Sequence, residues 1–355
     1  MPLKNKVYLL LTTISGLEDV LIEEISELYG NTIEILESRR GWIIASIDSN
    51  SPSTLIDNLI ASSRSLERIY TILFRTKLEI DCIKTAIEST SIHSMFTPYT
   101  KFAIKLDKEK YVDVDSYQLV RILGDLVCNT IEKRKGYRPI VSLDNPDIEI
   151  YCKVFNRELI FAFDITGPKA LHFREWRVYL HPSTLNAIIA YAMARLSKAK
   201  TATRVLDPMC GSGTILIETG LAYSKPMLYG MDINIRHVEG TLENIRRAGL
   251  ESRCTLKVGD ALSIREYFDL SFDRIITNPP YGIRELSYCR TLYELYEGFM
   301  KSALEVLTGN GYITLITPRR RLMKSILRKF KLKVVKRKDL EHGGIRATIF
   351  VLTSY

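Results

Sequence analysis

The sequence lacks the cysteine spacing of a zinc site or a disulfide framework. Its six cysteines are scattered along 355 residues. None forms a Cys-x-x-Cys pair, so reduced thiols are expected and a bound metal is not. No apolar run approaches the roughly 18 residues that a membrane span requires, and the first residues do not have the architecture of a signal peptide. The composition therefore favours a soluble cytoplasmic protein with no membrane partner, and we expect a monomer.

The glycine-rich stretch at residues 203–218 lacks the third glycine of a dinucleotide-binding fingerprint. Gly211 and Gly213 follow a short apolar strand, but Leu216 stands where the third glycine would be. No Gly-x-x-x-x-Gly-Lys phosphate loop occurs either. The pattern still predicts a strand, a tight turn and a helix whose first N–H groups can bind an anion. Because Asp207 precedes the turn, the loop suits a ligand with cationic or hydroxyl groups, and S-adenosylmethionine is the predicted cofactor.

Negative charge is concentrated at the amino-terminal end. The first sixty residues contain nine carboxylates against four Lys or Arg, a balance of −5. Since the whole chain carries +9, the remaining residues carry +14. This distribution is typical of proteins that bind a polyanion, although a lysine-rich solvated surface gives the same numbers.

The first half of the chain divides into two predicted α+β units, residues 1–75 and 76–167. In the first, strands at 6–13, 32–37, 42–47 and 66–74 with helices at 17–29 and 52–61 give the β-α-β-β-α-β order of a ferredoxin-like fold. In the second, helices are predicted at 79–90 and 115–133, with strands at 101–106, 148–154 and 159–163. The basic residues Arg134, Lys135 and Arg138 follow the long helix. They indicate RNA contact or only complement the helix dipole.

A linker at 168–200, with a helix from about residue 182 to 196, leads to a third unit at 201–355. There strands and helices alternate, which predicts a mostly parallel, doubly wound α/β sheet. Strands are expected at 203–207, 227–231, 255–258, 274–277, 312–316, 332–335 and 347–352, with helices at 214–223, 234–248, 291–307 and 320–330. His172 and His181 have no companion at metal-ligand spacing, so both are interpreted as structural.

Four polar side chains follow four successive strands of the third unit: Asp207, Asp232, Asp260 and Asn278. Ligands of an open α/β sheet bind at the carboxyl ends of its strands. Asp232 lies 25 residues after Asp207, close to the ~20-residue offset at which an acid binds ribose hydroxyls. Asp260 with the Ala261 backbone suits an adenine amine. Each aspartate alone is more often a loop or cap residue, but the series predicts a cofactor site.

Residues 278–282, Asn-Pro-Pro-Tyr-Gly, end the fourth strand in a stiff backbone. The Asn278 side-chain oxygen and the Pro279 carbonyl form two fixed acceptors for the hydrogens of a planar exocyclic amine. Accepting both favours a pyramidal nitrogen whose lone pair can face a sulfonium methyl. Tyr281 offers a ring on which a flipped base can stack. A Pro-Pro-Tyr-Gly loop alone would also suit a rigid turn or a peptide-recognition element, but Asn278 before it and the motif at 203–218 favour the catalytic interpretation. No cysteine nucleophile stands in it, so carbon methylation is disfavoured.

Several stretches resemble known modules. Residues 163–167 (Phe-Asp-Ile-Thr-Gly) and 171–177 (Leu-His-Phe-Arg-Glu-Trp-Arg), with 121–124 and 145–150, resemble a THUMP RNA-binding domain, although many relatives carry tyrosine where this chain has Trp176. The Asn-Pro-Pro-Tyr motif resembles that of amino-methyltransferases acting on adenine N6, guanine N2 or glutamine. Together they resemble the THUMP-containing tRNA (guanine-N2) methyltransferases, and most of all those acting on guanosine 6 of the acceptor stem. Enzymes for position 10 more often carry Asp in place of Asn278.

The resemblance implies a Rossmann-like class I methyltransferase domain with a mostly parallel seven-stranded sheet, including a late antiparallel strand. It also implies direct in-line methyl transfer to a flipped tRNA base. Pattern and resemblance together assign catalysis to Asn278, Pro279 and Tyr281. They assign cofactor binding to Leu185, Asp207, Pro208, Cys210, Gly211, Gly213, Thr214, Asp232, Ile233, Asp260, Ala261 and Asn278. RNA contacts are expected from Arg134, Lys135, Arg138, Arg174, Arg177, Arg284, Arg319, Arg320 and Arg321.

The segment 319–338 contains eleven Lys or Arg and no acid. Such a face binds RNA backbone in a salt-dependent way, although part of it must be a solvated helix surface. Arg284 suits a phosphate near the flipped nucleotide or is a surface arginine. The alternatives left open are a tRNA guanosine-10 enzyme, a ribosomal RNA guanine-N2 enzyme, a DNA adenine-N6 enzyme and a non-catalytic RNA-binding factor.

Overall fold

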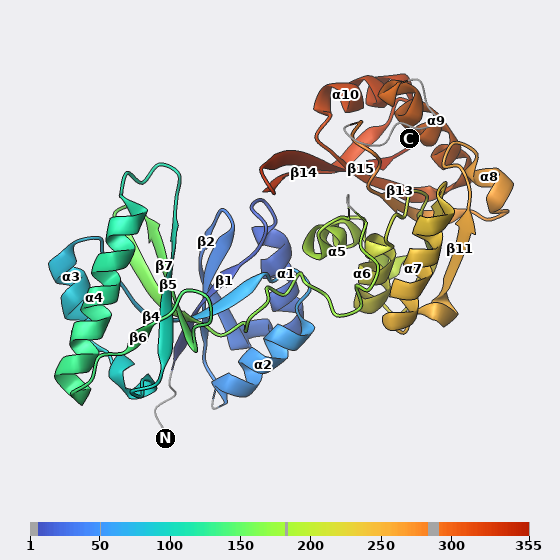
Figure 1. Cartoon of the computed structure of the whole chain (residues 1–355). Coiled ribbons are helices and arrows are strands. Elements are labelled where there is room, and N and C mark those ends of the chain that lie inside the picture. Colours follow the sequence, from blue (N-terminus) through green and yellow to red (C-terminus); the bar gives the residue numbers. More distant parts are fainter. Residues whose placement is uncertain (1–5, 50, 182–183, 283–290, 355) are drawn as a thin grey trace.

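The computed structural model describes residues 6–49, 51–181, 184–282 and 291–354, which form two lobes (Figure 1). The first lobe begins with β1 (Val7–Thr12), α1 (Glu18–Tyr29), η1 (Gly30–Thr32), β2 (Ile33–Arg39), β3 (Trp42–Ile47), α2 (Pro52–Ser62) and β4 (Arg68–Lys77). The strands pair antiparallel in the order β2-β3-β1-β4. The β-α-β-β-α-β order read from the sequence is confirmed.

The second unit of this lobe continues the same sheet. It comprises α3 (Ile80–Ser89), η2 (Ile92–Met95), β5 (Lys101–Lys108), α4 (Ser116–Lys135), β6 (Ile140–Val141), β7 (Ile148–Phe155) and β8 (Glu158–Asp164). β8 pairs antiparallel with β4, so one eight-stranded sheet runs β2-β3-β1-β4-β8-β7-β5-β6. The boundary predicted at residue 75 falls inside β4, because that strand forms ladders with both β1 and β8. β6, too short to show periodicity, was not predicted.

The second lobe begins with α5 (Ala187–Leu196), η3 (Ala199–Thr201), β9 (Arg204–Asp207), α6 (Thr214–Ala222), β10 (Met227–Asp232), α7 (Ile235–Arg247), η4 (Glu251–Arg253) and β11 (Cys254–Val258). It continues with α8 (Ile264–Tyr267), β12 (Phe272–Thr277), α9 (Leu292–Val306), β13 (Leu307–Thr317), α10 (Arg320–Lys329), β14 (Lys333–His342) and β15 (Ile345–Thr353). The sheet order is β11-β10-β9-β12-β13-β15-β14, with β15 antiparallel to both neighbours. This confirms the predicted seven-stranded sheet with a late antiparallel strand.

The linker helix begins later than the sequence suggested. We expected it to start near residue 182, which lies outside the described residues together with 183. α5 instead begins at Ala187, because the Asn186 side chain caps it by accepting a hydrogen bond from Ile188 N at 2.8 Å. Before it, Thr184 N donates to His181 O and His181 N donates to Thr184 Oγ1, both at 2.9 Å. Residues 177–181 and 184–185 are therefore irregular, and we call these seven residues the strap.

The two lobes share a hydrophobic core. Ile14 and Leu17, just before α1, and Val20 in its first turn pack in one cluster with α5, α6 and β15. Figure 1 shows α1 facing α5 across this junction, and the β14–β15 hairpin reaching back toward the first lobe. At its tip, Glu341 N donates to Ser15 O at 3.2 Å, and Lys338 pairs with Asp19 at 2.6 Å. Across the described residues, none of the helices combines the length and apolar character needed to cross a bilayer.

Candidate active site at the carboxyl ends of the strands

The sheet of the second lobe places the four predicted strand-end side chains along one edge. Asp207 ends β9 and Asp232 ends β10, while Asp260 follows β11 and Asn278 follows β12. The four strands are adjacent in the order β11-β10-β9-β12 and run parallel. Parallel strands end at the same edge, and the sheet order reverses between β9 and β12. This is the position at which open α/β sheets bind ligands.

The glycine loop between β9 and α6 is held by its neighbours in space. Gly211 N donates to Asp232 Oδ2 at 3.0 Å, and Gly211 O accepts from Thr241 Oγ1 at 2.7 Å. Gly213 has φ of 77°, and a Cβ there would lie 2.7 Å from Thr241 Cγ2. Only glycine tolerates both constraints. Gly213 caps α6 without a side-chain hydrogen bond, so the first N–H groups, beginning with that of Thr214, have no side-chain cap.

Burial sets the protonation of the two titratable groups in this loop. Asp207 is only 1% exposed, and burial raises the pKa of its carboxyl to about 7, with a smaller contribution from the Asp232 charge. Burial also raises the pKa of the Cys210 thiol well above its ordinary value, helped by the same two carboxylates. Cys210 is therefore a neutral thiol that lines the loop. Pro208, between them, is buried as well.

Asp232 is held by three donors. Its oxygens accept from Gly211 N, from Asn234 N at 3.0 Å and from His237 Nδ1 at 3.1 Å. His237 is itself in edge-to-face contact with the His181 ring, with ring centroids 4.3 Å apart. The carboxylate is thus fixed in orientation. Next to it, Ile233 exposes its apolar side chain, as a residue that packs on a planar base would.

The strap crosses the glycine loop and is fastened to it. Asn244 Oδ1 accepts from Val178 N and Tyr179 N, both at 2.9 Å, while its Nδ2 donates to Tyr179 O and Ser212 O. Thr184 Oγ1 lies 3.1 Å from the Ser212 hydroxyl. A Cβ on Gly240 would lie 2.2 Å from the Tyr179 ring, so that ring packs directly on α7. These contacts place Leu185 beside the loop, where the resemblance had placed a cofactor contact.

The Asn-Pro-Pro-Tyr loop is built on β12. The Tyr281 hydroxyl donates to Asn278 Oδ1 at 2.7 Å, and burial raises the pKa of this phenol well above its ordinary value. Pro279 is buried and Asn278 is half-buried. Arg319 Nε donates to Tyr281 O at 3.0 Å, so the residue that precedes α10 supports this loop. On the other flank, Asp260 caps its own turn by accepting from Leu262 N, beside the buried Ala261.

The predicted RNA-binding arginines differ in their surroundings. Arg134, Lys135 and Arg321 are exposed, and Arg319 and Arg320 lie at the start of α10. Arg138 folds back on α4 to pair with Asp125 and Glu132, and Arg320 pairs with Asp339 at 3.0 Å. Arg284 lies outside the described residues.

Two arginines predicted to contact RNA are half-buried and form hydrogen bonds inside the protein. Arg174 Nε donates to Glu218 Oε1 at 3.0 Å, and its other nitrogens donate to Leu171 O and Arg64 O. Arg177 Nη2 donates to Leu185 O at 2.7 Å. Arg174 thus uses its donors inside the protein and Arg177 uses Nη2 there, while the RNA contact expected from each of them stays a prediction.

A polar stripe on α7 was not predicted from the sequence. His237, Thr241 and Asn244 hold Asp232, the glycine loop and the strap, respectively. They stand at positions i, i+4 and i+7, which share one helix face. Polar residues at helical spacing directly after a strand-end acid were the signal that could have found them.

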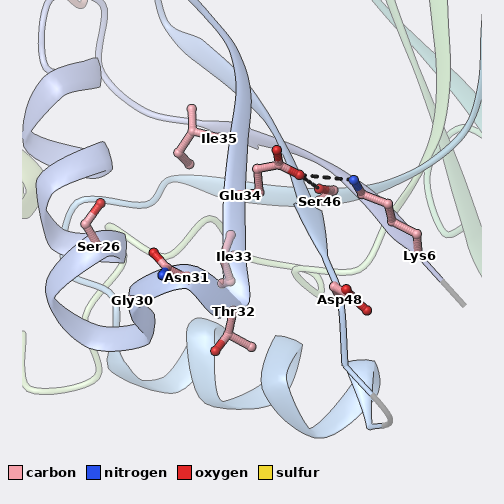
Figure 2. A pocket seen from close by; sticks show the side chains of 10 residues that line it. All are labelled: Lys6, Ser26, Gly30, Asn31, Thr32, Ile33, Glu34, Ile35, Ser46 and Asp48. Atoms are coloured by element: carbon pink, nitrogen blue, oxygen red, sulfur yellow. Dashed lines mark hydrogen bonds and ion pairs between the residues drawn. The ribbon is translucent and has the colours of Figure 1, made fainter. Parts of the chain in front are cut away.

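One surface hollow lies elsewhere. Figure 2 shows it on the first lobe, lined by Lys6, Ser26, Gly30, Asn31, Thr32, Ile33, Glu34, Ile35, Ser46 and Asp48. Lys6 Nζ and Ser46 Oγ both donate to Glu34 Oε2, at 3.0 and 3.2 Å. None of the predicted site residues lines it.

Comparison with protein-family models identifies two modules. Residues 78–164 match the THUMP domain, and residues 174–348 match the RMKL-like methyltransferase domain. Both matches agree with the modules that the sequence motifs resembled.

One curated relative and one solved structure extend over almost the whole chain. A tRNA (guanine(6)-N2)-methyltransferase of Archaeoglobus fulgidus is 32% identical over 96% of this chain and 90% of its own length. A tRNA (guanine(10)-N2)-dimethyltransferase of Methanothermobacter thermautotrophicus is 33% identical, but over 61% of this chain and 62% of its own length. The crystal structure of TrmN from Thermus thermophilus superposes with a TM-score of 0.80 and 25% identity, covering 98% of this chain and all of that one.

Proposed function

The chain belongs to the family of THUMP-domain methyltransferases that includes the Archaeoglobus fulgidus enzyme. We propose that it methylates the exocyclic N2 amine of a guanosine in tRNA, with S-adenosylmethionine as methyl donor. The observation that carries the proposal is the junction of β9 and β12. These adjacent parallel strands end in the glycine loop and in the Asn-Pro-Pro-Tyr loop. A methyl donor on the first would face an amine held by the second.

The residues at the strand ends suit this cofactor. Asp232 presents a fixed carboxylate for ribose hydroxyls, and Ile233 presents an exposed apolar side chain for the adenine face. Asp260 and the Ala261 backbone suit the adenine amine. A Cβ on Gly211 would meet nothing within 4 Å, so the loop has open space above it. When bound, the cofactor supplies a methyl group on a positively charged sulfur.

The chain's contribution is then to select and orient the acceptor amine. Asn278 Oδ1 receives one hydrogen bond from Tyr281, and a carbonyl-type oxygen has two lone pairs. The second lone pair and the Pro279 carbonyl accept the two amine hydrogens, while the Tyr281 ring supports the base. Holding the amine in line with the donor supplies most of the acceleration, through positioning and preorganised dipoles.

Guanosine 6 of the acceptor stem is the proposed target. The guanine(6) relative matches along 96% of this chain, whereas the guanine(10) relative matches along 61%. Asn278, rather than Asp, at the head of the catalytic motif favours the same choice. A guanosine-10 or ribosomal RNA guanine-N2 activity remains the second candidate.

The direct test is incubation of the protein with methyl-labelled S-adenosylmethionine and unmodified tRNA, followed by mass spectrometry of the mapped nucleosides. N2-methylguanosine at position 6 is expected. Asn278→Ala should lower kcat by about 10²–10³-fold, the effect of removing one preorganised polar group, and should change the Kd for S-adenosylhomocysteine far less. Near-normal turnover of Asn278→Ala would refute the catalytic assignment. A methyl group on another nucleotide would refute the position.

RNA binding is assigned to the exposed basic residues of α10 and β14, together with the end of α4. Arg319 touches the catalytic loop through Tyr281 O, and Arg321, Lys324 and Arg328 continue along α10 as exposed side chains. Because Arg319 ties α10 to the loop, a strand of RNA that places a base over Tyr281 would run along this helix. Backbone contacts of this kind weaken steeply as salt rises.

Salt dependence tests this surface. Replacing Arg321 and Lys324 together by Gln should weaken tRNA binding and lower the slope of log K against log salt by up to about two. The matched control replaces Lys198 and Lys225 by Gln. These two exposed residues precede β9 and β10, at the amino ends of the strands and away from the proposed site. The slope of this control should stay that of the unaltered protein. Equal slopes for the two double variants would contradict the assignment.

A further inference from the structure

Arg174 and Arg177 lie one turn apart and serve different purposes. Arg177 N donates to Arg174 O at 3.2 Å, which closes the turn. Arg174 faces the Glu218 carboxylate and forms an ion pair with it. The Arg177 side chain lies against Leu185 and the start of α6, where Nη2 donates to Leu185 O at 2.7 Å and lies 3.5 Å from Thr214 Oγ1.

The Arg177 guanidinium has unused donors and lacks a countercharge. Its Nε is sealed from solvent without a partner among the described residues. Nη1 also has no hydrogen-bond partner among the described residues, and it is accessible to solvent. No described carboxylate forms an ion pair with it. Burial lowers the pKa of this arginine, which the Glu218 charge offsets only in part. A half-buried cation of this kind favours an anionic partner.

The neighbours of Arg177 identify where that partner would lie. Leu185 is the last residue of the strap, and Thr214 is the first residue of α6 after the glycine loop. Asn244 holds the strap and the glycine loop together, since its Nδ2 donates to Tyr179 O in the strap and to Ser212 O in the loop. The guanidinium therefore points, from a fixed position, at the loop to which the cofactor is assigned.

We propose that Arg177 binds the α-carboxylate of the methionine portion of the cofactor, an inference that rests on the proposed function. The carboxylate is the only negatively charged group of S-adenosylmethionine and of its product S-adenosylhomocysteine. A guanidinium presents donors in a planar fork that matches a carboxylate, and this is among the strongest polar interactions in proteins. The Thr214 hydroxyl, 3.5 Å from Arg177 Nη2, lies within reach of the same carboxylate. Arg177 is thus a cofactor-binding residue that fixes the far end of the methyl donor.

The test compares two ligands that differ in this carboxylate alone. Kd values for S-adenosylhomocysteine and for its decarboxylated analogue, S-adenosyl-3-thiopropylamine, are measured by calorimetry with the full chain. The unaltered protein should prefer the carboxylated ligand. Arg177→Gln should weaken its binding by roughly 10–100-fold, as expected for loss of a charge-assisted pair, and leave the analogue almost unchanged. Arg177→Lys, which keeps the charge and loses the fork, should give an intermediate ratio.

Arg174→Lys is the matched control from the same turn. It should lower thermal stability through the Glu218 pair and preserve the ratio of the two Kd values. Equal losses for both ligands in Arg177→Gln, or an unchanged Kd for S-adenosylhomocysteine, would overturn the role of Arg177. Should Arg177→Gln fail to fold, the ratio in Arg177→Lys decides. An unaltered protein that binds neither ligand would instead refute the proposed function.

Discussion

At the scale of single residues, Asp207 shows how position rather than residue type decides charge. A carboxyl at a strand end was predicted from the sequence because it precedes a tight turn. Its protonation could not be predicted, since it depends on complete burial beside Asp232. The folded-state pKa near 7 means that the folded protein retains this proton over a pH range in which the unfolded chain has lost it.

This difference makes stability depend on pH with a definite sign. The unfolded carboxyl ionises near its ordinary pKa of 3.8, and the folded one ionises near 7. Between these values the folded state binds more protons, so its stability falls as pH rises, by up to about 4 kcal/mol in total. Asp207→Asn removes the ionisation. The unaltered protein should therefore lose about 2–3 kcal/mol of its free energy of unfolding between pH 5 and pH 8 that the variant does not lose. The difference, variant minus unaltered protein, should be larger at pH 8 than at pH 5 by that amount.

Urea unfolding at the two pH values measures this difference. Asp269→Asn, at an exposed site on the same lobe, is the control and should show no such change. A difference between Asp207→Asn and the unaltered protein that is the same at pH 5 and pH 8 would show that Asp207 ionises normally in the fold.

The arginines show that the contact partner of a long side chain could not be predicted from the sequence around it. Arg134 and Arg174 are both basic residues near a predicted helix end or linker, and both were assigned to RNA. Arg134 is exposed, whereas Arg174 meets Glu218, which stands 44 positions away. No local pattern shows which partner a long side chain will find. The strand-end acids were predictable because strand and turn periodicity alone place them.

At the scale of secondary-structure elements, α6 connects the cofactor loop to the first lobe. Glu218 is fully buried in this helix and pairs with Arg174 and with Arg64, at 3.0 Å in each case. Arg64 is in turn held by Glu24, which accepts from its backbone N at 2.8 Å. The helix that follows the glycine loop is therefore held by one charge from the first lobe and one from the linker. Sequence periodicity predicted α6 but not this connection.

Removing the charge of the buried Glu218 carboxylate should destabilise the folded protein. Glu218→Gln leaves two arginines without their shared counterion, and the expected loss is about 3–5 kcal/mol in the free energy of unfolding, measured by urea denaturation. Glu251→Gln breaks an exposed pair with Arg246, for which a loss below about 1 kcal/mol is expected. Similar losses in the two variants would indicate that solvent screens the Glu218 cluster.

At the scale of the whole molecule, α1 joins the two lobes. The sequence predicted one apolar stripe along this helix, and the structure divides it. Leu21 and Ile25 pack in the core of the first lobe, whereas Leu17 and Val20 belong to the core shared with α5. The acidic face of α1 is also used, since Arg195 pairs with Glu23 and Glu27. Part of the negative charge of the first sixty residues thus holds the lobes together.

The order of elements within each lobe followed from periodicity, but the arrangement of the lobes could not. An amphipathic pattern shows that a helix has a buried face and does not show what covers that face. Val20 is 1% exposed at the junction, while Leu28, on the same helix, is 49% exposed. The two positions form a natural pair for testing whether the lobes unfold together.

The chain's two tryptophans report on the two lobes separately. Trp42 is buried in the first-lobe sheet, and Trp176 packs in the core shared with α5. Fluorescence of Trp42→Phe and Trp176→Phe proteins should show coincident urea transitions, because the shared core couples the lobes. Adding Val20→Asp places a charge in that core, at a cost of roughly 3 kcal/mol or more, and should separate the two midpoints. Leu28→Asp should leave them coincident. Coincident midpoints in the Val20→Asp proteins would mean that contacts other than α1, such as the β14–β15 hairpin, suffice to couple the lobes.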